Sequence, residues 1–549
     1  MATLSKPKPS RRAWIPLALC CAALAFLQAS ALPVDTTDPV TPLNIAAAHS
    51  RGSKPTSILL KGGTIIAYND QEHDLDIIRD GSLLIVNDRI TAVGKDIGDV
   101  PAGTEIVDVA GGIITPGFVD THKHSWQHLY QTMEPDITLG EYVWKYSSTA
   151  KITMHLDVQD IYSSTKMSLM DSLNGGVTSI LDHGHATFTP KHIEGMMNAT
   201  IESGARVWQA YTVMPVHSRK EDKFKLDYTG VNRNGWRWKQ LQALAKQAPW
   251  ADGRVQLGLA WESGRTVQEA RHGFEQARDL NLSVVTVHHV GFPIQPDSGY
   301  MAKPIYQLNE WGFLNSTYPI VFSHGTLVDG GDLSLLRKNN HFVSVTPESE
   351  HHFAHGQLFA HRVLTQGALG TDVSATFSSD MITQMRLQLQ STRNLLANPV
   401  HYNMRYANNT AMTVKQAFLL GTRNGGLALH RPDIGVIKKG AKADVVVFSS
   451  DNPAFSAFYD PVAAVVLHSH VGHIQHVLVD GRWVKRDFKL QGVDWPKIKA
   501  DFEAAARKVQ KISDNEDWAA VRQETWSALH VTDDMEEAVP RVSVDPSQL

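Results

Sequence analysis

Two histidines that stand two residues apart, His122 and His124, are the residues of this sequence best placed to do chemistry. They follow an apolar run, residues 113–119, which is typical of a buried β-strand. Side chains alternate faces along a strand, so residues two apart point the same way. Two imidazoles that converge from a rigid strand supply half of a metal site. Because the chain contains 26 histidines, such a pair can also arise by chance, and the metal site needs further ligands.

Other apolar runs also end in side chains that can bind a metal. These side chains are His288 and its neighbour His289, then His324, and finally Asp372. A single histidine at such a position is more often a hydrogen-bonded structural residue than a ligand. Several such positions that meet at one place favour a mononuclear metal site with an open coordination position, where a bound water is activated.

The elements that carry these residues follow a regular alternation of strand and long amphipathic segment. Helix-like stretches, such as residues 161–173 and 266–280, separate most of the strands. Eight strands are predicted: residues 113–119, 176–183, 205–211, 255–260, 283–288, 320–324, 342–346 and 368–372. Eight such units predict an α/β fold, a closed (β/α)8 TIM barrel over residues 113–425, whose strands present chemistry at their carboxyl ends.

Short strands separated by turns occupy both ends of the chain. They fill residues 57–112, and they return in residues 426–490, at 443–448, 462–467 and 476–484. Two to four strands alone are marginally stable. The sequence therefore predicts one small β-sandwich built from both chain ends. Residues 491–549 are predicted to form a helix, over 495–512, followed by a polar tail.

The first 31 residues have the pattern of a secretory signal peptide. Basic residues precede an apolar stretch at residues 13–27, and Ala29 and Ala31 form a small-residue cleavage site. We expect cleavage after residue 31, a flexible leader over residues 32–56, and a secreted protein or one of another secretory-pathway or periplasmic compartment. An uncleaved signal anchor is the alternative; after cleavage no membrane span is expected.

Composition narrows the remaining possibilities. Both cysteines, Cys20 and Cys21, lie in the predicted signal, so the mature chain has neither a disulfide nor a thiolate metal site. The net charge of −4 and the absence of a basic stripe argue against a nucleic-acid partner. The sequence allows a homo-oligomer. Four sequons permit a glycoprotein, at Asn198, Asn281, Asn315 and Asn408.

Beyond these patterns, the chain resembles the amidohydrolase superfamily, in its branch of metal-dependent deaminases and chlorohydrolases. The matching segments occur in the family's order across residues 57–490. They are residues 116–124, 176–182, 285–288, 322–325, 369–372, 424–426 and 440–447. The resemblance implies a metal-dependent hydrolase whose site lies at the mouth of the barrel.

The resemblance also implies roles for individual residues. It makes His122, His124, His288 and Asp372 the ligands of one divalent metal per chain, Zn²⁺ or Fe²⁺. Asp372 also accepts the proton of the attacking water, and His324 orients that water or polarises the substrate. His289 is the alternative to His288 as a ligand, although strand alternation favours His288.

Two departures from the family pattern affect the expected chemistry. The branch has a glutamate that exchanges protons with the substrate, and here Gly291 stands in its place. Glu348 and Glu350 are candidate substitutes, and the alternative is that they lie in a solvated loop. Binuclear relatives carry a bridging lysine on the fourth strand, but residues 255–260 contain none, which favours one metal. Glu262 is the alternative bridging ligand.

The predicted function is hydrolysis of a C–N bond, of an amide or an amidine, in a small-molecule substrate. Trp126 and Gln127 follow the histidine pair and are candidates for the substrate pocket, or else pack in its wall. Two alternative functions remain: a barrel that binds a small molecule without catalysis, for which Gly291 argues, or a lyase or decarboxylase at the same metal site.

Overall fold

The computed structural model of the chain describes residue 45 and residues 57–219, 223–262, 266–290, 304–356, 359–529, 531–532 and 538–539. The predicted signal peptide, nearly all of the predicted leader, and Gly291 lie outside the described residues. Among the helices that the structure describes, none is long and apolar enough to cross a membrane.

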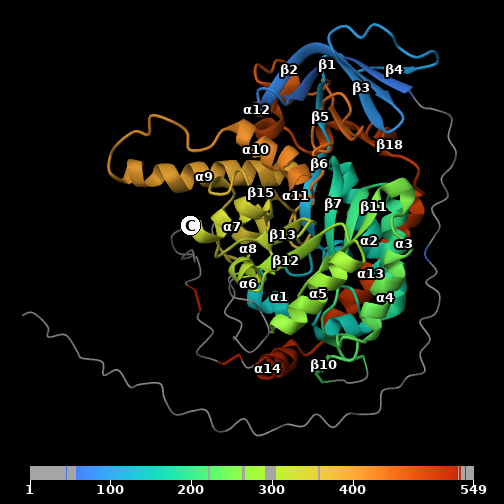
Figure 1. The fold of residues 1–549 in the computed structure, drawn as a ribbon, viewed down its shortest axis with the longest axis vertical. Helices are drawn as coiled ribbons and strands as arrows, with labels where there is room; N and C mark the ends of the chain where they lie inside the picture. Colours follow the sequence, from blue (N-terminus) through green and yellow to red (C-terminus); the bar gives the residue numbers. More distant parts are fainter. Residues whose placement is uncertain are drawn as a thin grey trace, which may run out of the picture. The chain divides into compact units, whose positions relative to one another are not determined.

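Eight parallel strands form the barrel, and each is hydrogen-bonded to the next (Figure 1). A bridge between Lys123 and Asp372 joins the last strand to the first, and the Asp372 amide donates to the His122 carbonyl at 2.8 Å. This confirms the predicted TIM barrel. The strands are β6 (Phe118–Lys123), β7 (Val177–Gly184), β8 (Arg206–Thr212), β11 (Val255–Ala260), β12 (Val285–His289), β13 (Ile320–His324), β14 (Phe342–Val345) and β15 (Gly367–Leu369).

Helices follow the strands and several begin at capping boxes. The Asp157 carboxylate accepts backbone N–H groups at the start of α2, and the Thr266 hydroxyl does the same for α5. The helices of the barrel are α1 (Leu139–Lys145), α2 (Val158–Asn174), α3 (Pro190–Ser203), α4 (Trp236–Ala245), α5 (Val267–Asp279), α6 (Pro304–Glu310), α7 (Gly330–Asn339), α8 (Pro347–His352), α9 (Met381–Tyr402), α10 (Val414–Leu420) and α11 (Arg423–Ala428).

Short helical turns complete the connections, and one further strand pair lies between β8 and α4. The 3-10 turns are η1 (Ser125–Tyr130), η2 (Lys151–His155), η3 (Ala251–Gly253), η5 (Phe359–His361), η6 (Pro453–Phe455) and η8 (Val471–His473). The strand pair is β9 (Val216–His217) with β10 (Leu226–Asp227).

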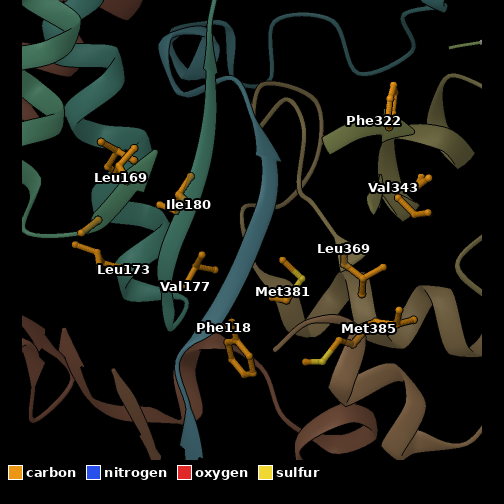
Figure 2. Close-up of a cluster of buried hydrophobic side chains, with 14 of the residues drawn as sticks. Phe118, Leu169, Leu173, Val177, Ile180, Phe322, Val343, Leu369, Met381 and Met385 are labelled. Atoms are coloured by element: carbon orange, nitrogen blue, oxygen red, sulfur yellow. The ribbon is translucent and has the colours of Figure 1, made fainter. Parts of the chain in front are cut away.

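Apolar side chains pack between the barrel strands and the helices outside them. Leu169 and Leu173, four residues apart on α2, lie beside Val177 and Ile180 of β7 (Figure 2). On other strands Phe118, Phe322 and Leu369 belong to the same cluster, which is buried throughout.

The two chain ends meet in one nine-stranded mixed sheet with a buried core of its own. Strand β5 joins the two ends, because it pairs with β1 on one side and with β16 on the other. This confirms that both chain ends build one β domain; it was predicted as a small β-sandwich, and its strands form one mixed sheet. The strands are β1 (Ser57–Asn69), β2 (Asp74–Val86), β3 (Arg89–Gly94), β4 (Glu105–Asp108), β5 (Ile113–Pro116), β16 (Val445–Phe448), β17 (Ile474–Val479), β18 (Arg482–Arg486) and β19 (Lys489–Leu490).

Two details of this region differ from the prediction. Residues 113–119 are not one strand: β5 belongs to the nine-stranded sheet, and the barrel begins with β6 after Gly117. Residues 462–467, predicted as a strand, are helical in α12 (Pro461–Ala463) and in the π-turn η7 (Ala464–His468). The reason is local, because the Asp460 carboxylate accepts two backbone N–H groups and Pro461 occupies the first helical turn.

Two helices follow the sheet at the carboxyl end. The predicted helix is confirmed as α13 (Trp495–Asp514), and the predicted polar tail contains a further helix, α14 (Trp518–Ala528). Helix α13 packs against α2 and η1, and α14 packs against α1. These contacts place the C-terminal helices on the segment that follows the His122–His124 pair.

Candidate metal centre

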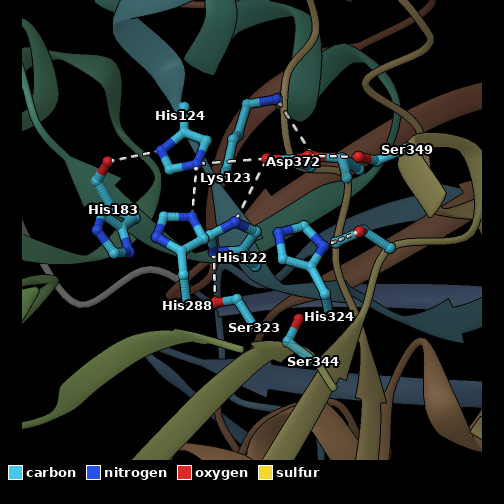
Figure 3. Close-up of polar contacts among 12 residues, drawn as sticks. His122, Lys123, His124, His183, His288, Ser323, His324, Ser344, Ser349 and Asp372 are labelled. Atoms are coloured by element: carbon cyan, nitrogen blue, oxygen red, sulfur yellow. Dashed lines mark hydrogen bonds and ion pairs between the residues drawn. The ribbon is translucent and has the colours of Figure 1, made fainter. Parts of the chain in front are cut away.

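Two overlapping groups of potential metal donors lie at the mouth of the barrel: His122 with His124 and Asp372, and His122 with His183 and His288 (Figure 3). Within each group the donor atoms lie within 4.8 Å of one another. Oδ1 of Asp372 lies 3.3 Å from Nε2 of both His122 and His124. Nε2 of His288 lies 3.2 Å from Nε2 of His124. A tetrahedral metal with ligand bonds of about 2.0–2.1 Å needs donors about 3.3 Å apart, and these three separations match that spacing.

The backbone directs these side chains toward one point. His122 and His124 share a face because they are two residues apart at the end of β6. Asp372 and His324 both adopt left-handed backbone conformations, with φ of 60° and 74°. Such conformations are costly for residues other than glycine, and they cluster where a side chain must be aimed.

His122, His124 and His288, the three imidazoles predicted as ligands, are each held through Nδ1. Nδ1 of His124 donates to the His183 carbonyl at 2.9 Å, and Nδ1 of His288 donates to the Glu262 carboxylate at 2.6 Å. The Ser323 hydroxyl forms a 2.8 Å hydrogen bond with Nδ1 of His122. These bonds fix the rings so that Nε2 faces the centre, as metal binding requires.

The electrostatics of His122, His124 and Asp372 suit a cation, whereas His288 holds its proton more tightly and must release it to bind a metal. Burial lowers the pKa of His122 and His124, which keeps both imidazoles neutral. Burial opposes ionisation of Asp372, but the hydrogen bond from His122 and the nearby imidazoles hold its pKa well below its usual range. Burial also disfavours the charged form of His288, yet the adjacent Glu262 carboxylate outweighs it and raises the pKa of His288.

His324 and His289 lie differently with respect to the four predicted donors. The His324 ring is buried with its centroid 5.0 Å from that of His122, and its Nδ1 lies 2.8 Å from the Thr346 hydroxyl. His288, one residue before His289, is the member of that pair whose nitrogen lies among the donors. The structure thus brings together His122, His124, His288 and Asp372, with His324 beside them.

The two glutamates after β14 occupy different environments, and neither lies in a solvated loop, because residues 347–352 form α8. Glu350 is 1% exposed, and its Oε1 accepts the Thr346 amide at 2.9 Å and lies 3.8 Å from Nδ1 of His324. Burial raises the pKa of Glu350 to about 8. Glu348 instead accepts hydrogen bonds from Ser378 and Gln384, which hold it toward α9.

Trp126 and Gln127 are built into the wall of the site. Both side chains are fully buried. The Trp126 indole donates to Nδ1 of His185 at 2.6 Å, and the Gln127 amide donates to the Tyr142 hydroxyl at 2.9 Å. These contacts favour wall packing over direct contact with a substrate.

Three further residues, Glu262, His183 and His185, contact the candidate ligand side chains, which the sequence alone did not show. Oε1 of Glu262 lies 2.6 Å from Nδ1 of His288 and 3.0 Å from Nε2 of His183, so this carboxylate positions a ligand. The His183 ring is buried beside the rings of His122 and His288, and the His185 ring stacks on that of His124 at 4.1 Å. In the sequence, only the position of these three residues, at or just beyond strand ends, could have indicated this role.

Known proteins share this architecture. The amidohydrolase family model matches residues 113–484. The chain is 26% identical over 440 residues to the 5-methylthioadenosine/S-adenosylhomocysteine deaminase of Thermococcus sibiricus, which covers 78% of this chain and 94% of that protein. It is 23% identical over 465 residues to the 5'-deoxyadenosine deaminase of Methanosarcina mazei, which covers 82% of this chain and 98% of that protein.

Solved structures with a similar fold include two zinc-bound proteins. An adenosine deaminase from Xanthomonas campestris with bound zinc has a TM-score of 0.69 at 17% identity, covering 83% of this chain and 99% of that one. The atrazine chlorohydrolase of Arthrobacter aurescens TC1 in complex with zinc has a TM-score of 0.66 at 20% identity, covering 82% of this chain and 100% of that one.

The barrel, the His and Asp donor set and these similarities define a metal-dependent hydrolase that acts on carbon–nitrogen bonds. The family model matches well over half of the chain, so the chain belongs to the amidohydrolase family.

Proposed function

We propose that this enzyme is a hydrolytic deaminase, which removes an amino group from an electron-poor, amidine-type carbon of a small nitrogen heterocycle. The observation that carries the proposal is the pair of overlapping donor groups, His122 with His124 and Asp372, and His122 with His183 and His288, with the His324 imidazole beside them. The relatives whose names include 5-methylthioadenosine and 5'-deoxyadenosine support this substrate class.

The ligands would be His122, His124, His288 and Asp372. One divalent ion bound there, Zn²⁺ or Fe²⁺, would lower the pKa of a bound water. The Asp372 carboxylate accepts the proton of the attacking water, since its low pKa keeps it ionised. The His324 imidazole steadies the negative charge that develops when the new C–O bond forms. The C–N bond then breaks, and the nitrogen leaves as ammonia with the proton that Asp372 accepted.

Of the two candidate glutamates, Glu350 is better placed to act as the acid that the family pattern has where this chain has Gly291. A pKa raised to about 8 keeps this carboxyl protonated at neutral pH, and the Thr346 hydroxyl lies between it and His324, 3.5 Å from Oε1 of Glu350 and 2.8 Å from Nδ1 of His324. We expect Glu350→Gln to reduce kcat about a hundredfold, the usual size of a general-acid contribution. Glu348→Gln serves as the matched control and should retain near-wild-type activity. Equal activity in wild type and Glu350→Gln would remove Glu350 from the mechanism.

The substrate class can be tested on the full chain loaded with Zn²⁺ or Fe²⁺. Ammonia release would be measured with 5'-methylthioadenosine, S-adenosylhomocysteine, 5'-deoxyadenosine and simple amides, and chloride release with atrazine. We expect ammonia from at least one of the aminated heterocycles. No turnover across this panel, with metal bound, would instead favour a barrel that binds a small molecule without catalysis.

We further propose that the protein is exported and that residues 1–31 are removed. Support comes from the sequence alone, from the basic segment, the apolar stretch and the small residues Ala29 and Ala31. Amino-terminal sequencing of the protein recovered outside the cytoplasm should begin at Leu32. A mature chain that begins at Met1 or Ala2 would contradict cleavage.

A further inference from the structure

The Asp372 carboxylate is held through the oxygen that the histidine pair leaves free. Its Oδ1 lies 3.3 Å from Nε2 of His122 and of His124. Its Oδ2 accepts a hydrogen bond from the Ser349 hydroxyl at 2.6 Å (Figure 3). Ser349 is fully buried on α8. Because a hydrogen bond to an ionised carboxylate is among the strong ones, Ser349 fixes the rotation that presents Oδ1 to the histidines.

A second buried side chain stands behind Ser349. Nε2 of His355 lies 3.3 Å from the Ser349 hydroxyl oxygen, and His355 is 6% exposed. The single hydroxyl hydrogen of Ser349 goes to Asp372, because an ionised carboxylate can only accept. The Ser349 oxygen is left to accept from His355. Burial lowers the pKa of His355, although the Asp372 charge opposes this, so the ring is neutral with its one hydrogen on Nε2.

The chain makes a constrained turn to place His355 there. The Phe353 amide donates to the Ser349 carbonyl at 2.9 Å, and Ala354 then adopts a left-handed conformation with φ of 51°. Such a conformation is costly for alanine and persists where surrounding contacts require it. On the other side of His355, Gly356 has φ of 151°. The turn returns His355 to Ser349, on the helix that the chain has just left.

His355 also contacts the other side chain to which the proposed mechanism assigns a role. Its ring centroid lies 4.9 Å from that of His324, and the two ring planes are nearly perpendicular, at 89°. Helix α8 itself is tied to α9, because the Glu348 amide donates to Oε1 of Gln384 at 3.0 Å. The segment from α8 to His355 is thus anchored at its start and reaches both Asp372 and His324.

We propose that Ser349 and His355 are positioning residues for Asp372: His355 donates to Ser349, and Ser349 donates to Asp372, so that Oδ1 faces the predicted metal-binding histidines. Hydrogen bonds that run in one direction polarise one another, so the outer bond supports the inner one. The inference rests on the proposed function for the role of Asp372 as metal ligand and proton acceptor. It gives neither Ser349 nor His355 a contact with metal or substrate.

The zinc affinity of the full chain tests this proposal, because it does not depend on turnover. We expect Ser349→Ala to weaken zinc binding about 10- to 100-fold, the usual effect of losing a partner behind a ligand, as measured by competition with a chromophoric chelator. Ser349→Thr keeps a hydroxyl and should recover most of the affinity. His355→Leu should also weaken binding, whereas His355→Gln, whose amide can still donate, should stay near wild type.

A second His–Ser pair joins α8 to α9 and provides the matched control. Nε2 of His351 lies 2.7 Å from the Ser391 hydroxyl at the surface. Ser391→Ala and His351→Leu therefore remove the same chemical groups from the same two helices without touching Asp372. Both should leave the zinc affinity unchanged.

The variants also separate positioning from general loss of structure. Ser349→Ala combined with His355→Leu should bind zinc no more weakly than Ser349→Ala alone, because both changes break one chain of hydrogen bonds. Unchanged affinity in Ser349→Ala would overturn the proposal. If Ser349→Ala fails to fold, the His355 variants decide, since equal affinities in His355→Leu and His355→Gln would also overturn it. The expected order of zinc affinities without ammonia release from any substrate would support the positioning role and reject the deaminase.

Discussion

The orientation of single side chains decides whether this centre can hold a metal. Each imidazole that we propose as a ligand presents Nε2 because a neighbour hydrogen-bonds its Nδ1, and the shortest of these bonds joins His288 to Glu262 at 2.6 Å. Glu262 also lies 3.0 Å from Nε2 of His183, so one carboxylate orders two rings. A carboxylate behind a metal-binding histidine fixes the ring and raises its basicity.

Replacing this carboxylate should weaken the metal site without removing a ligand. We expect Glu262→Gln to reduce zinc affinity about 10- to 100-fold, the typical effect of losing a partner behind a ligand. Competition with a chromophoric chelator would measure the affinity, and Glu310→Gln, at an exposed position, is the control. An unchanged affinity in Glu262→Gln would show that His288 does not depend on Glu262.

Glu350 should make stability depend on pH. Burial raises its pKa from 4.5 to about 8 in the folded chain, so the folded state keeps a proton that the unfolded state releases. Unfolding therefore becomes more favourable as pH rises from about 5 to about 8. The melting temperature of Glu350→Gln relative to wild type should increase across this interval. A difference that does not change with pH would contradict the raised pKa.

At the scale of elements, alternation along the chain predicted the barrel because strands and helices bury periodic apolar faces. The same alternation predicted that His122, His288, His324 and Asp372 meet, since barrel strands end at one mouth. It did not separate β5 from β6, because an apolar run has the same pattern in either sheet. Nor could it show which atoms Glu262 contacts, since side-chain partners across strands depend on barrel closure.

The junction between barrel and sheet depends on a buried ion network. The Arg206 guanidinium of β8 donates to both carboxylate oxygens of Asp444, at 3.0 and 3.1 Å, and pairs with Asp480. Lys442 lies 3.0 Å from Asp480 and completes the network. Arg206 and Asp444 are almost fully buried, so each charge needs its partner.

Removing one partner from this junction should be strongly destabilising. We expect Asp444→Ala to cost about 3–5 kcal/mol, because it removes two hydrogen bonds from the buried Arg206 and leaves that charge with Asp480 alone, which Lys442 shares. Asp501→Ala, which removes the exposed pair with Lys497, should cost far less, because solvent screens that pair. Thermal and urea unfolding would measure both variants. Similar losses in the two would show that the junction does not depend on the buried pair.

For the whole molecule, the metal centre joins parts of the barrel that are far apart in sequence. The proposed donors come from β6 and the residue after it, from β12, and from Asp372, which bridges to Lys123 of β6, so a bound ion would link the first and last strands. Because the unfolded chain does not present these four donors together, metal binding favours the folded state.

Metal removal should therefore lower the stability of the whole fold. A ligand present at a thousandfold excess over its Kd adds about 4 kcal/mol to the free energy of unfolding. We expect the melting temperature of the wild-type chain to fall on chelation and to rise again with added Zn²⁺. His122→Ala, which loses a donor, should lose bound metal and show little response to either treatment. If wild type melts at the same temperature with and without chelator, the four side chains do not form a metal site that is coupled to folding.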